Sequence, residues 1–491
     1  MTEKVVYNDP TPNNFPADYD DSQVDSRVKI RSKSIAHKDY GVHVREALMQ
    51  GIEISSVVAN EAKNIANDTA SRQDNVEDRY DNQIAGNTDI NEVIDARKPT
   101  NKPSYSTLGE RLDNMPSNED VPNIKIGDAI KIGAKVSTDN QTKIDELKKN
   151  INHDLFNFVF FTDSHYDQWN DPNRTGLDRL NNALLMDGMV DAIIAGGDNV
   201  DGGSSLYDIV LSQHKEYIED MFFYHNEGSD KFILKGNHDD ASGRQISYRK
   251  SGDKEFANTT SIPSEDLKRI YNNTALLNGE KRNGNSNYFY KDYPDKKIRL
   301  VGLDSNDTPD TILNSDGFLK YPGLMYMGYR QTQIDWLANT ALQNVPEDYT
   351  TVIVGHVHAH ARTGANVQED DIYNDHYYNI DLVDQVINDF MRGTSSTLTS
   401  TTKDWEVSVK ADFTNQGKRI MAAFIHGHQH QDNYTSDLGF NNIGITSSIG
   451  SYINNPSGDG WAVISVDPTK QTIQVRGFGR AETRSFNFIN G

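Results

Sequence analysis

Short apolar runs that end abruptly in polar residues recur through the second part of the chain. They predict buried β-strands at residues 155–161, 190–195, 231–234, 298–303, 351–354 and 419–425. Apolar residues at helical spacing predict helices at 205–225, at 331–343 and around 382–391. This alternation predicts a layered α/β domain whose functional groups lie at the carboxyl ends of the strands.

The end of the chain has a different pattern. Shorter strands are predicted at 442–447, 461–466 and 472–477, which favours a mixed or antiparallel second half of the sheet system. Residues 359–417 interrupt the regular alternation with a helix and a Ser/Thr-rich run. We interpret them as an inserted cap or loop beside the site; a plain surface excursion is the alternative.

The first part of the chain has helical rather than strand character. Residues 1–35 are predicted to form an extended arm with a short strand at 28–30, and residues 36–113 a helical module. One heptad-like seam consists of Val58, Ala62, Ile65, Thr69, Arg72 and Val76. It fits either a long helix packed on its own chain or a short coiled coil that joins copies. Residues 114–150 are predicted to be a linker with a helix near 143–149, before a domain at 151–491.

Composition limits the possible partners. The chain of 491 residues is too long for one ordinary hydrophobic core, so two or more domains are expected. The mean hydropathy of -0.71 indicates that part of the chain is extended or solvated. The formal charge of -23 argues against non-specific binding to nucleic acid or anionic membranes, although bound cations would reverse the sign locally. The absence of cysteine excludes disulfides and thiolate metal sites. We expect no transmembrane helix and no secretory signal.

Five polar stretches follow the predicted strands. They are Asp163-Ser164-His165, Gly197-Asp198, Gly236-Asn237-His238-Asp239, Gly355-His356 and Gly427-His428-Gln429-His430. On extended backbone, residues two apart such as Asp163 and His165 project to the same side. Oxygen and imidazole ligands together suit Mn, Fe, Zn or Ni better than Ca or Mg.

In this order, the five stretches resemble the calcineurin-like metallophosphoesterase family across roughly residues 153–482. The resemblance implies a β-sandwich flanked by helices and two divalent metal ions, for which Mn is our first expectation. It assigns the first ion to Asp163, His165 and His430, the second to Asn237, His356 and His428, and the bridge to Asp198. Chain order leaves His358 surplus, with either a substrate contact or simple packing as its role, and the histidines at 360, 376 and 426 are interpreted as non-ligands.

The same resemblance implies a mechanism. A hydroxide that bridges the metals would attack phosphorus, and His238 would give a proton to the leaving group. Asp239 would orient the ring of His238; a helix or turn cap is the alternative role for this carboxylate.

A second resemblance concerns the N-terminal part. Segments 44–48, 50–54, 92–97 and 107–112 are similar, in the same order, to tail and baseplate proteins of phages that infect Gram-positive bacteria. This implies a virion-attachment module that binds other tail proteins and is oligomeric, with a trimer as the expected state. A generic helical oligomerisation stalk is the alternative.

Together the two resemblances lead to a hypothesis about function. A phosphodiesterase on a phage tail would meet the host cell wall, where teichoic acid is an abundant phosphodiester polymer. Two alternatives stay open: an intracellular phosphodiesterase that acts on nucleotides or nucleic acid, and a receptor-binding tail protein without catalysis.

Overall fold

The chain divides into two compact units, Met1–Pro122 and Asn123–Gly491. The computed structural model describes residues 24, 26–36, 48, 55, 59, 63, 69, 138–167, 175–203, 207–222, 228–252, 254, 261–368, 370–449 and 459–490. The heptad-like seam, apart from Thr69, and most of the expected helical module lie outside these residues. None of the helices in the described ranges combines the length and apolar character that a membrane span needs.

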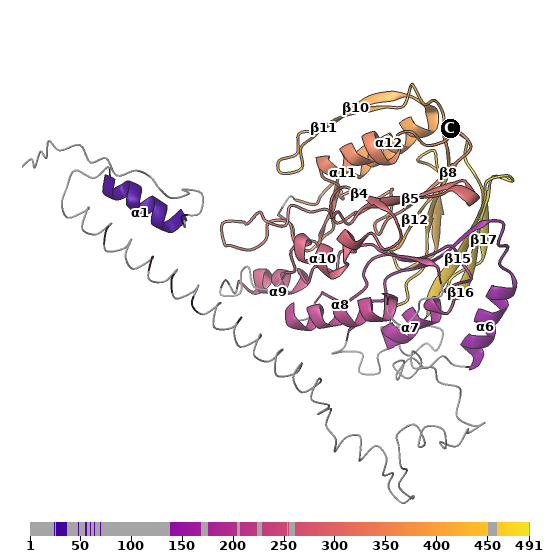
Figure 1. Cartoon of the computed structure of the whole chain (residues 1–491), viewed down its shortest axis with the longest axis horizontal. Helices are drawn as coiled ribbons and strands as arrows, with labels where there is room; N and C mark the ends of the chain where they lie inside the picture. The colour runs from indigo at the N-terminus through magenta and orange to yellow at the C-terminus, as the bar shows by residue number, and fades with distance from the viewer. Residues whose placement is uncertain are drawn as a thin grey trace, which may run out of the picture. The chain divides into compact units, whose positions relative to one another are not determined.

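One element is described in the first unit, the helix α1, Ser26–Ala36, coloured indigo in Figure 1. The expected strand at residues 28–30, and an extended arm as far as residue 35, are therefore wrong. Val28 and Ile30 alternate with basic residues, which is a strand pattern over five residues only. A helix completes its backbone hydrogen bonds within itself, whereas a strand needs a partner.

The second unit contains two large mixed sheets. The first has the order β17-β16-β15-β1-β2-β3, and β1, β2 and β3 are parallel. Its strands are β1 Phe156–Phe161, β2 Ala192–Ala195, β3 Asp230–Ile233, β15 Gly460–Asp467, β16 Thr472–Gly479 and β17 Arg484–Asn487. The strand β15 runs antiparallel to β1, so the C-terminal strands extend the sheet as a meander.

The second sheet has the order β13-β14-β12-β8-β6-β5-β4. Four of its strands, β6, β8, β12 and β14, are parallel. The bounds are β4 Lys281–Arg282, β5 Phe289–Tyr293, β6 Ile298–Gly302, β8 Thr350–Val354, β12 Ile420–His426, β13 Asn433–Thr435 and β14 Asn442–Gly444. All the strands predicted from apolar runs are thus confirmed, with shifts of a few residues at their ends.

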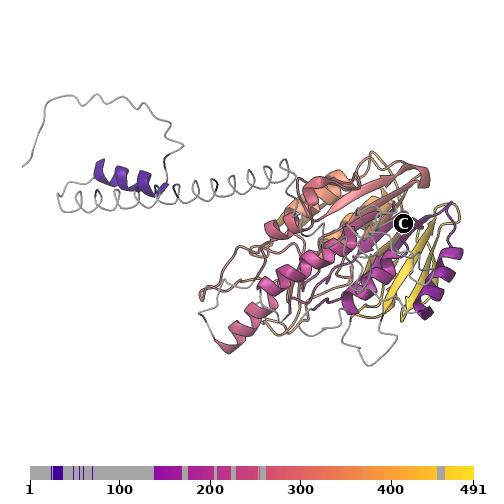
Figure 2. The same cartoon turned by 60° about the horizontal axis from the view of Figure 1, so that its bottom comes forward.

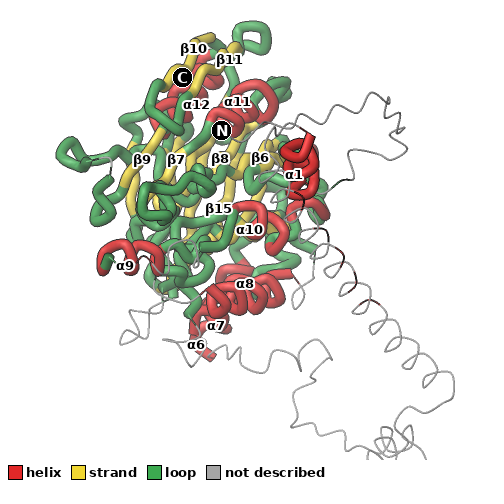
Figure 3. The backbone as a smooth tube through the Cα atoms, turned by 90° about the vertical axis from the view of Figure 1, so that its left-hand side faces the viewer, coloured by secondary structure: helices red, strands yellow, loops and turns green. Residues whose placement is uncertain are grey.

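Helices cover the outer faces of the two sheets. The helices α7, Thr175–Leu184, and α8, Tyr207–Phe222, lie on the side opposite to α11, Gln331–Trp336, and α12, Ile380–Arg392 (Figures 1 and 3). The π-helical turn Leu337–Ala341 continues α11. Shorter pieces complete the unit: α9 Gly243–Ser251, α10 Ser264–Ile270, and the 3-10 turns Asn273–Ala275 and Pro294–Lys296.

The position of β1 between two cores explains why its residues are apolar apart from Asn157. Phe156, Phe158 and Phe160 belong to the core between the two sheets, whereas Val159 and Phe161 belong to the core under α7 and α8. Because both faces of the strand are buried, its side chains are apolar except Asn157, whose amide is hydrogen-bonded to the Ser465 hydroxyl and to backbone carbonyls.

The last part of the expected linker, residues 138–149, is a packed helix in the structure. The helix α6, Thr138–Lys149, lies beside the C-terminal strands of the first sheet (Figure 2). Its Ile144 is fully buried in the same cluster as Trp461 and Val463. Residues 138–149 are therefore part of the packed unit.

The insertion at 359–417 is folded rather than loop-like. It supplies the strand β9, His376–Tyr378, then α12, then the hairpin of β10, Ser395–Ser400, and β11, Val407–Asp412. The strand β9 pairs in parallel with β7, Tyr326–Gly328. The apolar side of α12 packs in the core on the outer face of the second sheet, which anchors the insertion.

The core between the sheets can be tested with a matched pair of leucines. Leu300 of β6 is fully buried there, whereas Leu277 is 57% exposed. We expect Leu300→Ala to lower the free energy of unfolding by about 2–5 kcal/mol, because it removes buried methyl groups and leaves a cavity. Leu277→Ala should change it by less than about 0.5 kcal/mol. Urea unfolding followed by tryptophan fluorescence measures both, and equal losses would contradict this layer arrangement.

Candidate metal centre

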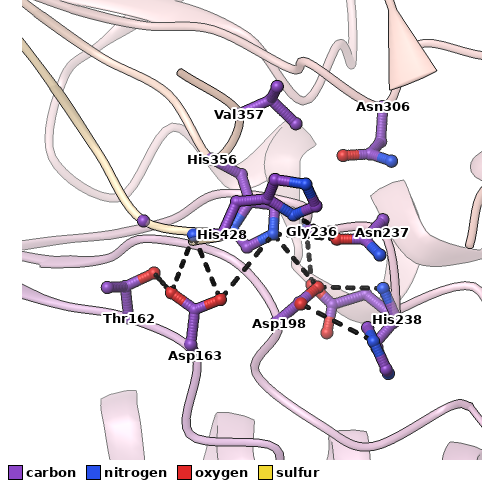
Figure 4. Close-up of polar contacts among 12 residues, drawn as sticks. Thr162, Asp163, Asp198, Gly236, Asn237, His238, Asn306, His356, Val357 and His428 are labelled. Atoms are coloured by element: carbon purple, nitrogen blue, oxygen red, sulfur yellow. Dashed lines mark hydrogen bonds and ion pairs between the residues drawn. The ribbon is translucent and has the colours of Figure 1, made fainter. Parts of the chain in front are cut away.

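Five strands deliver polar side chains to one rim of the two sheets. Asp163 and His165 follow β1, Asp198 follows β2, and Asn237 and His238 follow β3. From the second sheet, His356 follows β8, and His428 and His430 follow β12. These strands are parallel within each sheet, so their carboxyl ends meet at the same edge, as Figure 4 shows for most of these residues.

The backbone at these residues is not extended. Five of them have positive φ angles between 44° and 69°, in the left-handed region: Asp163, His165, Asp198, His428 and His430. The expectation that extended backbone places Asp163 and His165 on one side is therefore wrong; two left-handed residues do so instead. Such a conformation costs about 1–3 kcal/mol per residue and is typical of functional sites.

The first group of donors lies between β1 and β12. The Nε2 atoms of His165 and His430 are 3.1 Å apart. His165 Nε2 is 3.4 Å from Asp198 Oδ2, and His430 Nε2 is 3.3 Å from Asp163 Oδ1. These four residues form one cluster of potential metal ligands.

The second group of donors surrounds Asn237. Its Oδ1 lies 3.0 Å from His356 Nε2 and 3.0 Å from His428 Nδ1. The Oδ1 atom of Asp198 is 3.3 Å from His356 Nε2. Because its other oxygen faces the first group, Asp198 lies between the two groups, as a bridging carboxylate must.

The hydrogen bonds around this centre orient lone pairs toward it. His356 Nδ1 donates to Gly196 O at 2.9 Å, which leaves the lone pair of Nε2 facing two oxygens. The amide of Asn237 donates to Leu324 O, so its oxygen faces the histidines. Lone pairs that face one another repel unless a cation or proton lies between them, and this donor set therefore fits two divalent cations.

The pKa shifts of the site residues also fit the binding of cations at this centre. Burial raises the pKa of Asp163, but His356 and His430 outweigh it and lower the pKa to about 2. Burial lowers the pKa of His356, but Asp198 and Asp163 outweigh it and raise the pKa to about 9. A proton on His356 thus occupies the place that a cation would take. Burial lowers the pKa of His165 to about 4, which leaves that ring neutral and able to bind a metal.

Asp163 is further fixed by its neighbours. It accepts hydrogen bonds from Thr162 Oγ1 at 2.7 Å and from the backbone N–H of His428 at 3.0 Å. A Cβ atom at Gly427 would collide with both Thr162 and Asp163. The glycine before His428 is therefore needed for the close approach of the two ligand loops.

His238 lies beside the two groups and forms a further cluster of potential ligands with His165 and Asp201. Its Nε2 is 4.0 Å from Asp198 Oδ2, and its Nδ1 is 3.1 Å from Asp201 Oδ1. Burial lowers the pKa of His238, but Asp198 and Asp201 outweigh it and raise the pKa to about 9. The two carboxylates thus favour the protonated form of the ring, which is the form that a proton donor requires.

The expected role of Asp239 is wrong. Its carboxylate accepts hydrogen bonds from the backbone N–H groups of Asn199, Val200 and Gly236 and from the Asn199 side chain. It therefore fixes the loops after β2 and β3, which corresponds to the turn-cap alternative. Asp201 orients His238 instead, and its position three residues after Asp198 is a signal that sequence reasoning overlooked.

The surplus histidines have other partners. His358 Nε2 is paired with Gln429 Nε2 at 3.2 Å, and His426 Nδ1 donates to Gly427 O at 3.0 Å. His376 Nε2 faces Asp371 O. In the described part of the chain, none of these three, nor His360, belongs to a cluster of potential ligands.

The insertion lies beside the centre, as expected, and supplies a contact that sequence reasoning missed. Tyr377 of β9 places its hydroxyl 3.1 Å from His428 Nε2. No motif marks this tyrosine, because it reaches the centre only through the pairing of β9 with β7.

The bridging position of Asp198 leads to a test of metal content. We expect the unmodified protein to hold two divalent metal ions per chain and Asp198→Asn to bind at both positions more than about 100-fold more weakly. This exceeds the loss of about 10–100-fold typical for an outer hydrogen-bond partner, because a bridging charge is removed. Elemental analysis after desalting measures the content, with circular dichroism to check the fold and exposed Asp154→Asn as control. Two tightly held ions in Asp198→Asn would contradict the bridge.

Comparison with known proteins places this centre in a family. The sequence profile of the calcineurin-like phosphoesterases matches residues 156–432. Among solved structures, a dimetal phosphatase from Danio rerio is similar with a TM-score of 0.39 and 14% identity, over 68% of this chain and 99% of that chain. The curated proteins include no match to this chain. Membership of the matched family implies two divalent metal ions, in agreement with the two donor groups. The matched region spans more than half of the sequence and includes every residue of the centre, so the chain belongs to the calcineurin-like phosphoesterase family.

Proposed function

We propose that this phosphoesterase is a phage tail-associated phosphodiesterase that cleaves glycerol- or ribitol-phosphate linkages of cell-wall teichoic acid, with Mn²⁺ as its preferred metal. The observation that supports the proposal most is the complete dimetal donor set with His238 beside it. The N-terminal segments that resemble tail and baseplate proteins suggest where such an enzyme would work. The proposed location is the virion, in an oligomer, with three copies as our expectation.

The residues of the centre suit phosphodiester hydrolysis. When bound, two divalent cations neutralise the charge of the phosphate and make water a better nucleophile. Asp201 holds Nδ1 of His238, so Nε2 faces Asp198 and the centre at which a phosphate would bind. The leaving group from a polyol phosphate is an alkoxide, a strong base, and it needs a proton as the bond to phosphorus breaks. A protonated His238 can donate it.

The local charge also suits an anionic polymer. Asp163 and Asp198 place two negative charges against two divalent cations, which leaves the occupied centre positive within an acidic protein. The formal charge of -23 disfavours binding of any polyanion, nucleic acid or teichoic acid alike, away from the centre.

The substrate can be tested directly. Purified protein with Mn²⁺ should release soluble phosphate-bearing fragments from isolated wall teichoic acid, and chromatography of the products reports glycerol or ribitol chemistry. Cyclic nucleotides and single-stranded DNA serve as parallel substrates. An inert wall polymer together with turnover of the nucleotides would contradict the proposed substrate while leaving the phosphoesterase intact.

Substitution of His238 distinguishes catalysis from binding alone. We expect His238→Ala to lower turnover of the polymer by about 10²–10⁴-fold, because the proton donor is lost, with the metal content unchanged. His153→Ala, at an exposed position before β1, is the matched control and should retain full activity. Tight binding of the polymer without any turnover by the unmodified protein would favour a receptor-binding role and contradict catalysis on this substrate.

A further inference from the structure

A chain of three polar groups connects the insertion with the second group of metal donors. Tyr377 Oη is 3.1 Å from His428 Nε2 and 3.0 Å from Asp375 Oδ2. His428 follows β12 and belongs to the group of donors around Asn237. The insertion therefore touches the centre through the outer nitrogen of a metal ligand.

The direction of these hydrogen bonds follows from the donor set. The Nδ1 atom of His428 faces Asn237 Oδ1 and must offer its lone pair to a cation. Its single proton is then on Nε2, which donates to Tyr377 Oη. The phenol in turn donates its own proton to the carboxylate of Asp375, which can only accept. The imidazole therefore donates to the phenol, and the phenol donates to the carboxylate.

The fold holds Tyr377 firmly in this position. It is the central residue of β9, opposite Met327 of β7. Figure 3 shows these two strands side by side. Thr363 Oγ1 accepts a hydrogen bond from its N–H at 2.7 Å and donates to its carbonyl at 3.2 Å. The ring also lies edge-on to that of His428, with the centroids 6.3 Å apart.

We propose that Tyr377, held by Asp375, is a positioning residue that fixes the ring orientation and tautomer of His428 and so determines the affinity of the second metal position. Ligating histidines commonly donate their outer N–H to a carboxylate or carbonyl, and loss of that partner costs about 10–100-fold in metal affinity. Here a phenol from the insertion takes this place and passes the contact on to a carboxylate. The inference rests on the dimetal centre and is independent of the identity of the polymer.

The test is metal binding by the Tyr377→Phe variant, which removes one oxygen and keeps the ring. Calorimetric titration with Mn²⁺ should show one site unchanged within about twofold and the other about 10–100-fold weaker than in the unmodified protein. At limiting Mn²⁺, electron paramagnetic resonance should show the signal of isolated ions in the variant and that of a coupled pair in the unmodified protein. Asp375→Ala should weaken the same site to a smaller extent.

Tyr373→Phe is the matched control, since this tyrosine belongs to the same insertion and is 67% exposed. It should bind two ions like the unmodified protein. If Tyr377→Phe is folded by circular dichroism and binds both ions with unchanged affinity, the positioning role is overturned and the dimetal centre stands. If the unmodified protein does not bind two ions, the dimetal centre fails as well. Calorimetry on the unmodified protein therefore separates the two failures.

Discussion

The mutual repulsion of the donors at the centre is the constraint on which the rest of the structure depends. Two buried carboxylates, an amide oxygen and four imidazole nitrogens face one another at 3.0–3.4 Å. Burial of unpaired charge is expensive, and the described partners of these carboxylates include histidines but neither lysine nor arginine. Two cations would turn the repulsion into attraction, so metal binding and local stability are linked.

The two-sheet architecture is what keeps these donors together. Left-handed backbone at five ligand residues is unfavourable by itself and persists only where the surroundings determine it. Phe160 packs between the sheets just before Asp163, and Asp239 and Gly427 fix the neighbouring loops. The fully buried strands thus act as a rigid base, and the conformational cost is confined to the turns that follow them.

The sequence was sufficient for the features that depend on local pattern. The apolar runs predicted strands such as β1, β2 and β8, since these are buried on both faces. The ordered polar stretches identified the donors that the structure brings together. The predictions that failed depend on contacts between distant segments or on the backbone conformation of the site residues. Asp239 and Asp201 are both close in sequence to a site residue, and only the packing of two loops decides which of them meets His238. The strand expected at 28–30 failed for a related reason, because no local pattern reveals whether a partner strand exists.

Tyr377 is another residue whose contact with the site no local sequence pattern reveals. It also shows that features shared by the family differ from features that are particular to this chain. The family resemblance accounts for the donors that any member needs, and the insertion at 359–417 is additional structure built around them. Through the pairing of β7 with β9, that insertion contacts His428 and forms part of the surroundings of the centre. A change of the insertion that moves Tyr377 would therefore also remove a hydrogen-bond partner of His428. Membership of the family therefore specifies the donors but not the substrate or the surroundings that the insertion adds.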